Sequence, residues 1–183
     1  APMYPVIRLI KELIVHGNAP DLPPTGTHVS HHICWPWDID HFVELNNGRT
    51  LTLYDLGRYP LAKRTGLLRV LRKNRWGLTM AGASVRYRKR IGLFDRFEMR
   101  SRALGYDDKF VYLEQSMWRG ETCCNQIVYR SAVTSSGKIV PPHKIWEELG
   151  ADGKMPDLPD WVKAWIIADA TRPWPPQDPA TRD

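Results

Sequence analysis

Two carboxylates and two side-chain amides stand close together in residues 35–58, WPWDIDHFVELNNGRTLTLYDLGR. Asp38 and Asp40 lie in a loop rich in tryptophan and proline, and Asn46 and Asn47 come just before a helix-like run. The first turn of a helix leaves about four backbone N–H groups without partners at the positive end of the helix dipole. When a carbonyl oxygen gains negative charge during attack, one such donor stabilises it by roughly 3 kcal/mol. The spacing is therefore compatible with acyl-transfer chemistry.

Asp40 lies six residues before Asn46, close enough in an irregular loop to face the same point. An ionised aspartate could act as a nucleophile or could deprotonate a water molecule. The same residues are equally typical of a turn that is followed by an ordinary helix cap. Spacing alone leaves both interpretations open.

The composition indicates one globular domain. A chain of 183 residues can bury one hydrophobic core and is short for two. No apolar run approaches the roughly 20 residues that a membrane-spanning helix needs. The odd number of cysteines, Cys34, Cys123 and Cys124, disfavours a disulfide framework. We therefore expect a reducing, cytoplasmic location and interpret the cysteines as buried thiols.

Positive charge is concentrated in the middle of the chain. Fourteen lysines and arginines fall between Arg58 and Arg102, against only Asp95 and Glu98. Such a stretch attracts nucleic acid, a membrane surface or a phosphorylated cofactor, although a solvated basic face is the simpler interpretation. Because no nucleic-acid-binding motif accompanies it, we expect no nucleic-acid partner.

A histidine-rich strand raises the question of a metal. On a strand, His28 and His32 share one face and His31 points away. No cysteine or carboxylate motif completes a ligand set. We expect no metal and no cofactor.

Periodicity divides the chain into a few helices and an antiparallel sheet. We expect an amphipathic helix in 1–18, a linker in 19–27, strands in 27–35, 79–90, 95–104, 109–118 and 122–134, and a short helix in 141–149. A long helix should start at Asn46 or Asn47, and Pro60 should end or kink it. The extension 151–183 should hold one or two helical turns and then a proline-rich end.

Four strands joined by short turns imply an antiparallel sheet that must bury one face. The economical solution is an α+β fold in which a curved antiparallel sheet wraps around one long central helix. The N-terminal helix repeats apolar residues at helical spacing: Val6, Ile7, Leu9, Ile10, Leu13 and Ile14. We expect this stripe to pack against the domain, and contact with a membrane surface is the less favoured alternative.

The stretch DIDHFVELNNGRTL resembles the D-x-D-x-x-G-H-V-N-N-x-x-Y signature of hotdog-fold acyl-CoA thioesterases of the 4-hydroxybenzoyl-CoA thioesterase type. The likeness continues through YDLGR, SVRYRKRIGLFDRFEMRSRALGYDDKFVYLEQ and PDLPDW, a pattern similar to the thioesterase superfamily member six branch. It covers most of residues 28–165. The resemblance implies a hotdog thioesterase-like domain at 28–150.

The resemblance also implies an activity and its residues. The expected reaction is hydrolysis of an acyl-CoA, or a related thioester such as one on acyl carrier protein, to free acid and thiol. Asp40 would be the base or nucleophile, with backbone N–H groups from Glu44 to Asn47, including Asn46, as the oxyanion site. Coenzyme A phosphates would meet four basic residues at the end of a strand, namely Arg86, Arg88, Lys89 and Arg90. A homodimer or tetramer is implied, with sites where subunits meet.

Three residues depart from the family pattern. Val43 stands where glycine is common, Glu44 where histidine is common, and Thr50 where tyrosine is usual. A side chain at position 43 could crowd the backbone N–H group that meets the thioester oxygen, and Glu44 adds negative charge there. These departures keep a second hypothesis open, a non-catalytic domain that binds acyl thioesters or a protein partner.

Overall fold

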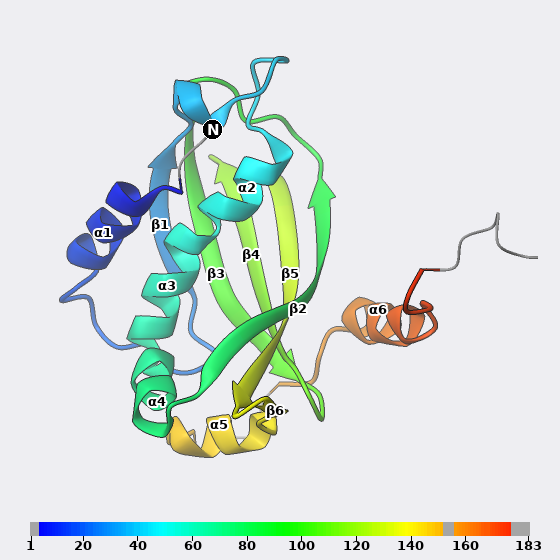
Figure 1. Cartoon of the computed structure of the whole chain (residues 1–183). Helices are drawn as coiled ribbons and strands as arrows, with labels where there is room; N and C mark the ends of the chain where they lie inside the picture. The colour runs from blue at the N-terminus through cyan, green and yellow to red at the C-terminus, as the bar shows by residue number, and fades with distance from the viewer. Residues whose placement is uncertain (1–3, 152–155, 177–183) are drawn as a thin grey trace, which may run out of the picture.

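The computed structural model describes residues 4–151 and 156–176. Its strands are β1 (His28–Ile33), β2 (Gly77–Tyr87), β3 (Arg96–Tyr106), β4 (Val111–Arg119), β5 (Thr122–Ser135) and β6 (Lys138–Ile139). Its helices are α1 (Val6–Val15), α2 (Asn47–Leu53), α3 (Asp55–Arg64), α4 (Leu67–Asn74), α5 (Pro142–Glu148) and α6 (Asp160–Ala170), with a 3-10 turn η1 at Pro36–Asp38. A curled antiparallel sheet wraps around α2 and α3, which confirms the predicted α+β architecture (Figure 1).

The sequence predicted an antiparallel sheet without an order for its strands, and the structure supplies that order. The sheet runs β1-β3-β4-β5-β2, with β6 paired to β5, so β2 pairs with β5 and not with the strand that follows it. Residues 88–95 carry the chain from one side of the sheet to the other. The backbone N–H groups of Arg88 and Lys89 both donate to the carbonyl of Cys124, at 2.8 and 3.0 Å, which fixes this connection to β5.

The central helix starts as the sequence predicted. Asn46 is its N-cap, and the side-chain oxygen of Asn46 accepts a hydrogen bond of 3.0 Å from the backbone N–H of Arg49. Pro60 does not end the helix, because α3 continues to Arg64, and the division between α2 and α3 falls at Tyr54 instead. Pro60 is buried, so its packing offsets the hydrogen bond that proline cannot make.

Buried polar contacts fix the central helix on the inner face of the sheet. The side-chain amide of Gln115 donates to the Tyr54 carbonyl and to the hydroxyl of Ser101, both at 2.8 Å. The Tyr54 hydroxyl donates to the side-chain oxygen of Asn125. The helix approaches the sheet so closely that a Cβ atom on Gly57 would lie 2.5 Å from the Ser101 oxygen. Only glycine fits at this crossing without displacement of its neighbours.

The first strand buries its polar face. β1 alternates as predicted, but the buried side chains are His28, Ser30 and His32. Nδ1 of His28 lies 3.1 Å from the Arg64 guanidinium, and Nε2 of His32 lies 2.8 Å from the Ser30 hydroxyl. Burial lowers the pKa of His28 to about 4 and that of His32 to about 3, and nearby cations lower both pKa values further. Both histidines are therefore neutral at pH 7.

The N-terminal helix α1 packs beside α3 and β1, but not with its apolar stripe as predicted (Figure 1). Glu12 is buried, whereas Ile7 and Ile14 are exposed; Leu9 alone of the stripe reaches the main core. The reason is that the buried Asp38 carboxylate pairs with Arg8 at 2.6 Å and that Glu12 lies 3.8 Å from the neutral ring of His32, so the polar side of the helix turns inward. None of the helices within residues 4–151 and 156–176 is long and apolar enough to cross a membrane.

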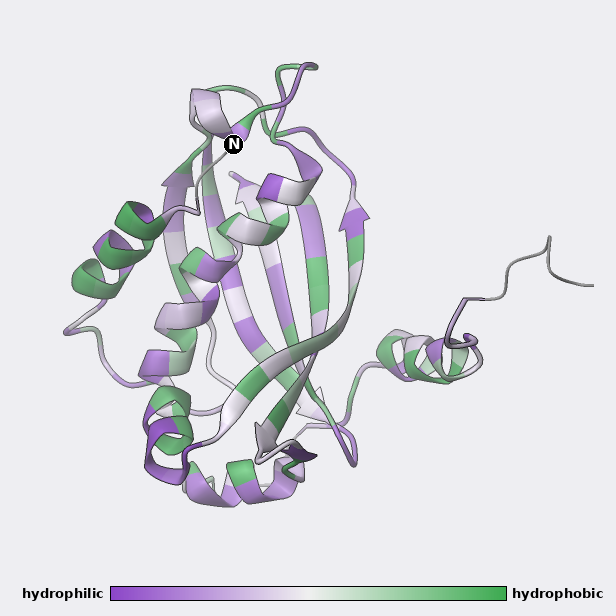
Figure 2. Cartoon of the chain, viewed as in Figure 1, coloured by the Kyte–Doolittle hydropathy of each residue, from purple (hydrophilic) through white to green (hydrophobic). Residues whose placement is uncertain are grey.

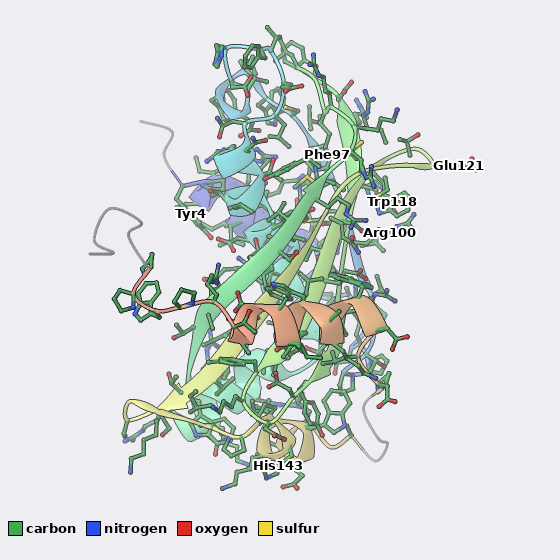
Figure 3. All side chains as sticks on the ribbon, turned by 90° about the vertical axis from the view of Figure 1, so that its right-hand side faces the viewer. Tyr4, Phe97, Arg100, Trp118, Glu121 and His143 are labelled. Atoms are coloured by element: carbon green, nitrogen blue, oxygen red, sulfur yellow. The ribbon has the colours of Figure 1, made fainter. Side chains whose placement is uncertain are left out.

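The C-terminal helix α6 covers the lower part of the outer face of the sheet. It is eleven residues long, more than the one or two turns predicted, because Val162 packs with Tyr112 and Val128. Above it the outer face is polar, with Arg100 stacked 4.4 Å from the ring of Trp118 on the side away from Tyr4 (Figure 3). The predicted proline-rich end lies partly outside the described residues, and the proposed domain bounds 1–18, 19–27, 28–150 and 151–183 stay a prediction.

We expect Gly57→Ala to lower the free energy of unfolding by about 1–3 kcal/mol, because the added methyl group overpacks the contact with Ser101. Urea denaturation measures the change. Gly82→Ala is the matched control, since a Cβ atom there meets only the flexible Arg130 guanidinium at 3.4 Å. Equal stability of the two variants would contradict the close crossing.

We expect stability to fall as the pH drops from 7 to 5.5. The folded-state pKa values of His28 and His32 lie below the usual value of about 6.5, so the unfolded chain binds protons that the folded chain does not. The free energy of unfolding should fall by about 2 kcal/mol for the two histidines together between these pH values. This pH range lies above the pKa values of most carboxylates, so their protonation contributes little. Urea midpoints at several pH values test it; His32→Gln should halve the slope and the exposed His31→Gln should not change it.

Candidate functional site

The loop that carries Asp40 is a tight turn closed by its own backbone. The N–H of Asp40 donates to the Glu44 carbonyl at 2.9 Å, and the N–H of Val43 donates to the Asp40 carbonyl at 3.1 Å. One carboxylate oxygen of Asp40 accepts a hydrogen bond of 2.8 Å from the N–H of Phe42. Asp40 thus sits at the neck of the loop, half-buried, with one oxygen engaged in the turn.

Val43 has a backbone φ of 60°, in the left-handed region. A β-branched residue is strained there, and glycine is not. The glycine that is common at this position in the resembling family therefore has a conformational reason. The Val43 side chain is exposed, so its cost is backbone strain and not a side chain packed into the loop.

Asp38, the other carboxylate of the D-x-D pair, is buried and fully engaged. Its oxygens lie 2.6 Å from the Arg8 guanidinium and 2.7 Å from Nε of Arg49, and the backbone N–H of Trp35 donates to it at 3.1 Å. These contacts join α1, the loop after β1 and the start of α2. Asp38 is a structural residue.

The loop is joined to the basic segment that follows β2. The N–H of Leu45 donates to the Ile91 carbonyl at 2.8 Å, and Glu44 forms a β-bridge with Gly92. This pairing brings the Glu44 carboxylate to 2.8 Å from Nε of Arg90. The negative charge that Glu44 adds near the helix start is therefore balanced by an arginine.

A cavity of about 220 Å³ lies between the start of α2, the end of β2 and the start of β5. Its lining is mixed polar and apolar and includes Glu44, Leu45, Asn47, Thr50, Tyr87, Arg88, Lys89, Arg90, Ile91 and Asn125. Three of the lining side chains are exposed cations, and the single carboxylate among them is the one paired with Arg90. The cavity is suited to an anionic ligand.

The structure gathers five of the eight predicted site residues at this cavity: Glu44, Asn47, Arg88, Lys89 and Arg90. Asp40 and Arg86 are outside its lining. Asn46 faces a separate hollow, where it is beside Trp37, and its side chain is occupied as the helix cap.

Sequence reasoning missed two polar residues of the lining. Tyr87 immediately precedes the basic run, and its hydroxyl donates to the Asn47 carbonyl at 3.3 Å. Asn125 is opposite Tyr87 in the pairing of β2 with β5. The signal for Tyr87 was its position beside Arg88, but Asn125 could be found only from the strand register.

No histidine or cysteine is among the residues that line this cavity. Burial raises the pKa of the Cys34 thiol to about 11, with Asp38 raising it further, and burial also raises the pKa of Cys123. Neither thiol is ionised at neutral pH, which makes both poor nucleophiles. Within the described part of the chain, no group of three or more histidine, cysteine or carboxylate side chains could hold a metal ion.

Comparison with known proteins identifies the family of this chain and finds solved structures with a similar fold. The model of the thioesterase-like superfamily matches residues 34–166. Protein THEM6 of Xenopus laevis is 36% identical over 143 residues, which cover 76% of this chain and 67% of that protein.

Solved structures resemble the fold at low sequence identity. The probable thioesterase YbaW from Escherichia coli has a TM-score of 0.63 at 13% identity, covering 67% of this chain and 96% of its own. SAV2348 from Staphylococcus aureus, a hypothetical protein solved in complex with CoA, has a TM-score of 0.58 at 10% identity, covering 78% and 95%. The curled sheet around its central helix is thus the hotdog fold, and the chain belongs to the thioesterase-like superfamily.

Proposed function

We propose that the chain hydrolyses an acyl-CoA, or a related acyl thioester, to the free acid and the thiol. The observation that carries the proposal is the cavity at which the start of the central helix meets Arg88, Lys89 and Arg90. Membership of the thioesterase-like superfamily supports the reaction class.

The basic side chains would hold the phosphates of coenzyme A. Arg88, Lys89 and Arg90 are exposed at one end of β2, and the first two are fixed through their backbone to Cys124. Arginine and lysine bind phosphate through charge-assisted hydrogen bonds. Arg86 lies on β2, two residues before Arg88, and would add to the positive electrostatic potential. An acyl carrier protein, whose thiol arm also carries a phosphate, would use the same residues.

The start of α2 would stabilise the oxyanion. The first intrahelical hydrogen bond is donated by Thr50 to Asn46, at 2.8 Å, so the N–H groups of Asn47 and Gly48 precede the helical ladder. Asn47 is in the cavity lining. A carbonyl oxygen placed there would be stabilised as its negative charge develops.

Asp40 would supply the base. In this scheme its carboxylate takes a proton from water, and the water oxygen attacks the thioester carbonyl carbon. The oxyanion that forms faces the start of α2, the C–S bond breaks, and the thiolate leaves and takes up a proton. Support comes from the hydrogen bond between Asp40 and Glu44, which ties the neck of the loop to a residue of the cavity lining.

A second candidate function is binding without hydrolysis. It is favoured by the position of Asp40 outside the cavity lining, and by the ion pair between Glu44 and Arg90 at the cavity. Under this alternative the domain would hold an acyl thioester or a protein partner and release no thiol.

We also propose a homodimer formed along β2. This strand is at an end of the sheet, is eleven residues long and exposes Leu78 and Met80. A long edge strand with apolar side chains is prone to pair with another strand. Tyr87, at the end of β2, is in the cavity lining, so a second subunit on this edge would border the cavity.

A cytoplasmic location would fit the three free thiols.

Purified wild-type protein should release thiol from at least one member of a panel of acyl-CoAs. Asp40→Asn should lower kcat by at least about 100-fold with little change in KM, because it removes the base and keeps the oxygen that accepts from Phe42. Asp108→Asn, an exposed turn carboxylate, is the control and should leave kcat unchanged.

Two results would contradict the mechanism: no thiol release from any acyl-CoA, or an Asp40→Asn variant whose kcat equals that of the wild type. Calorimetry on the same panel separates the two candidate functions. Heat of binding without thiol release would establish the second candidate.

A further inference from the structure

The helix α1 displays a row of aliphatic side chains to solvent. Ile7, Ile10 and Ile14 are spaced three and four residues apart, so they share one face of the helix. Their side chains are 85%, 51% and 73% exposed, and Val6 and Val15 beside them are exposed as well. Figure 2 shows α1 coloured mainly as hydrophobic although it lies at the outside of the fold.

The opposite side of α1 is fixed to the domain. The Arg8 guanidinium is 2.6 Å from the buried Asp38 carboxylate and donates to the Ile33 carbonyl at 3.2 Å. Glu12 is only 3% exposed, with His16 at 3.4 Å and His32 at 3.8 Å from its oxygens. These contacts set the rotation of the helix about its axis. The apolar face is therefore held outward by the fold.

Two exposed lysines lie beside the exposed face. On α1 itself Lys11 is exposed, with its ammonium 3.3 Å from a carboxylate oxygen of Glu12, while Arg8 and Glu12 are turned toward the domain. Beyond the C-terminal end of α1, Lys63 of α3 reaches the Gly17 carbonyl at 3.4 Å. A row of aliphatic side chains flanked by lysines complements a surface that is apolar within and anionic at its border.

Tryptophan lies next to the same helix. A hollow of about 860 Å³ lies between the domain-facing side of α1 and the rim of the sheet, and its lining includes Glu12, Trp35, Trp37 and Glu98 as well as Lys11. Trp37 is exposed and stacks on Trp35 at a centroid distance of 5.5 Å. Tryptophan rings favour the boundary between lipid headgroups and acyl chains.

We propose that α1 lies in the surface of a lipid bilayer that contains anionic lipids. Ile7, Ile10 and Ile14 insert between the headgroups, and Lys11 and Lys63 contact lipid phosphates and carboxylates. We choose a bilayer over a protein groove because the exposed side chains of Lys11, Lys63 and Trp37 lie near the aliphatic row, and lysine and tryptophan are the residues that favour an anionic lipid surface. The contact is independent of the proposed hydrolysis, since it uses none of the residues around Asn47.

Flotation with lipid vesicles tests the proposal on the whole chain. Wild-type protein should float with vesicles of phosphatidylcholine and phosphatidylserine, less with phosphatidylcholine alone, and less at high salt. The double variant Ile7→Glu/Ile14→Glu should lower the partition coefficient at least about 100-fold, roughly tenfold for each lost isoleucine. Ile167→Glu on α6, which alters a 70% exposed isoleucine, is the matched control and should float like wild type.

Ile7→Ser/Ile14→Ser repeats the test without new charge, and circular dichroism confirms that each variant is folded. The proposal is overturned if wild type floats with neither vesicle, or if both folded double variants float like wild type. It is also overturned if light scattering shows a wild-type dimer that the double variants dissociate while no vesicle binds, because the face would then be an interface between two copies.

Discussion

The buried carboxylate of Asp38 is the interaction on which the rest of the site depends. It accepts from Arg8 of α1 and from Arg49 of α2, so one charge joins the N-terminal helix to the central helix through the loop after β1. The Asp38 carbonyl also accepts the N–H of Asn46, the helix cap, at 2.9 Å. Removing one partner of a buried ion pair typically costs 3–5 kcal/mol. Both the start of α2 and the outward face of α1 depend on this contact.

Local sequence patterns predicted most of the helices and strands, whereas contacts between residues far apart in the sequence determine how these elements pack. Strand alternation and the cap at Asn46 are set by nearby residues, so the sequence located them. The pairing of β2 with β5 joins residues 38 to 57 positions apart and has no local signal. The same is true of β1, where the polar face is buried because Arg64 and Ser30 supply partners for its histidines. The length of α6 likewise follows from its contact with the outer face of the sheet.

The candidate site was predicted in part. The family resemblance and the position of the basic run at a strand end placed Asn47 and Arg88–Arg90 together, and the structure gathers them around one cavity. The resemblance also drew attention to Val43, whose positive φ explains why glycine is favoured there. It could not show that Glu44 is neutralised by Arg90, because that ion pair depends on the bridge between the loop and Gly92.

Hydrogen–deuterium exchange with and without a non-hydrolysable acyl-CoA thioether locates the surface that the ligand covers. If the cavity beside the start of α2 receives the thioester, amides in residues 45–50 and 86–92 should exchange more slowly when the analogue is bound. Residues of the polar outer face around Arg100 should exchange as before. Slower exchange confined to other regions, or none at saturating analogue, would contradict the assignment of this cavity as the acyl-CoA site.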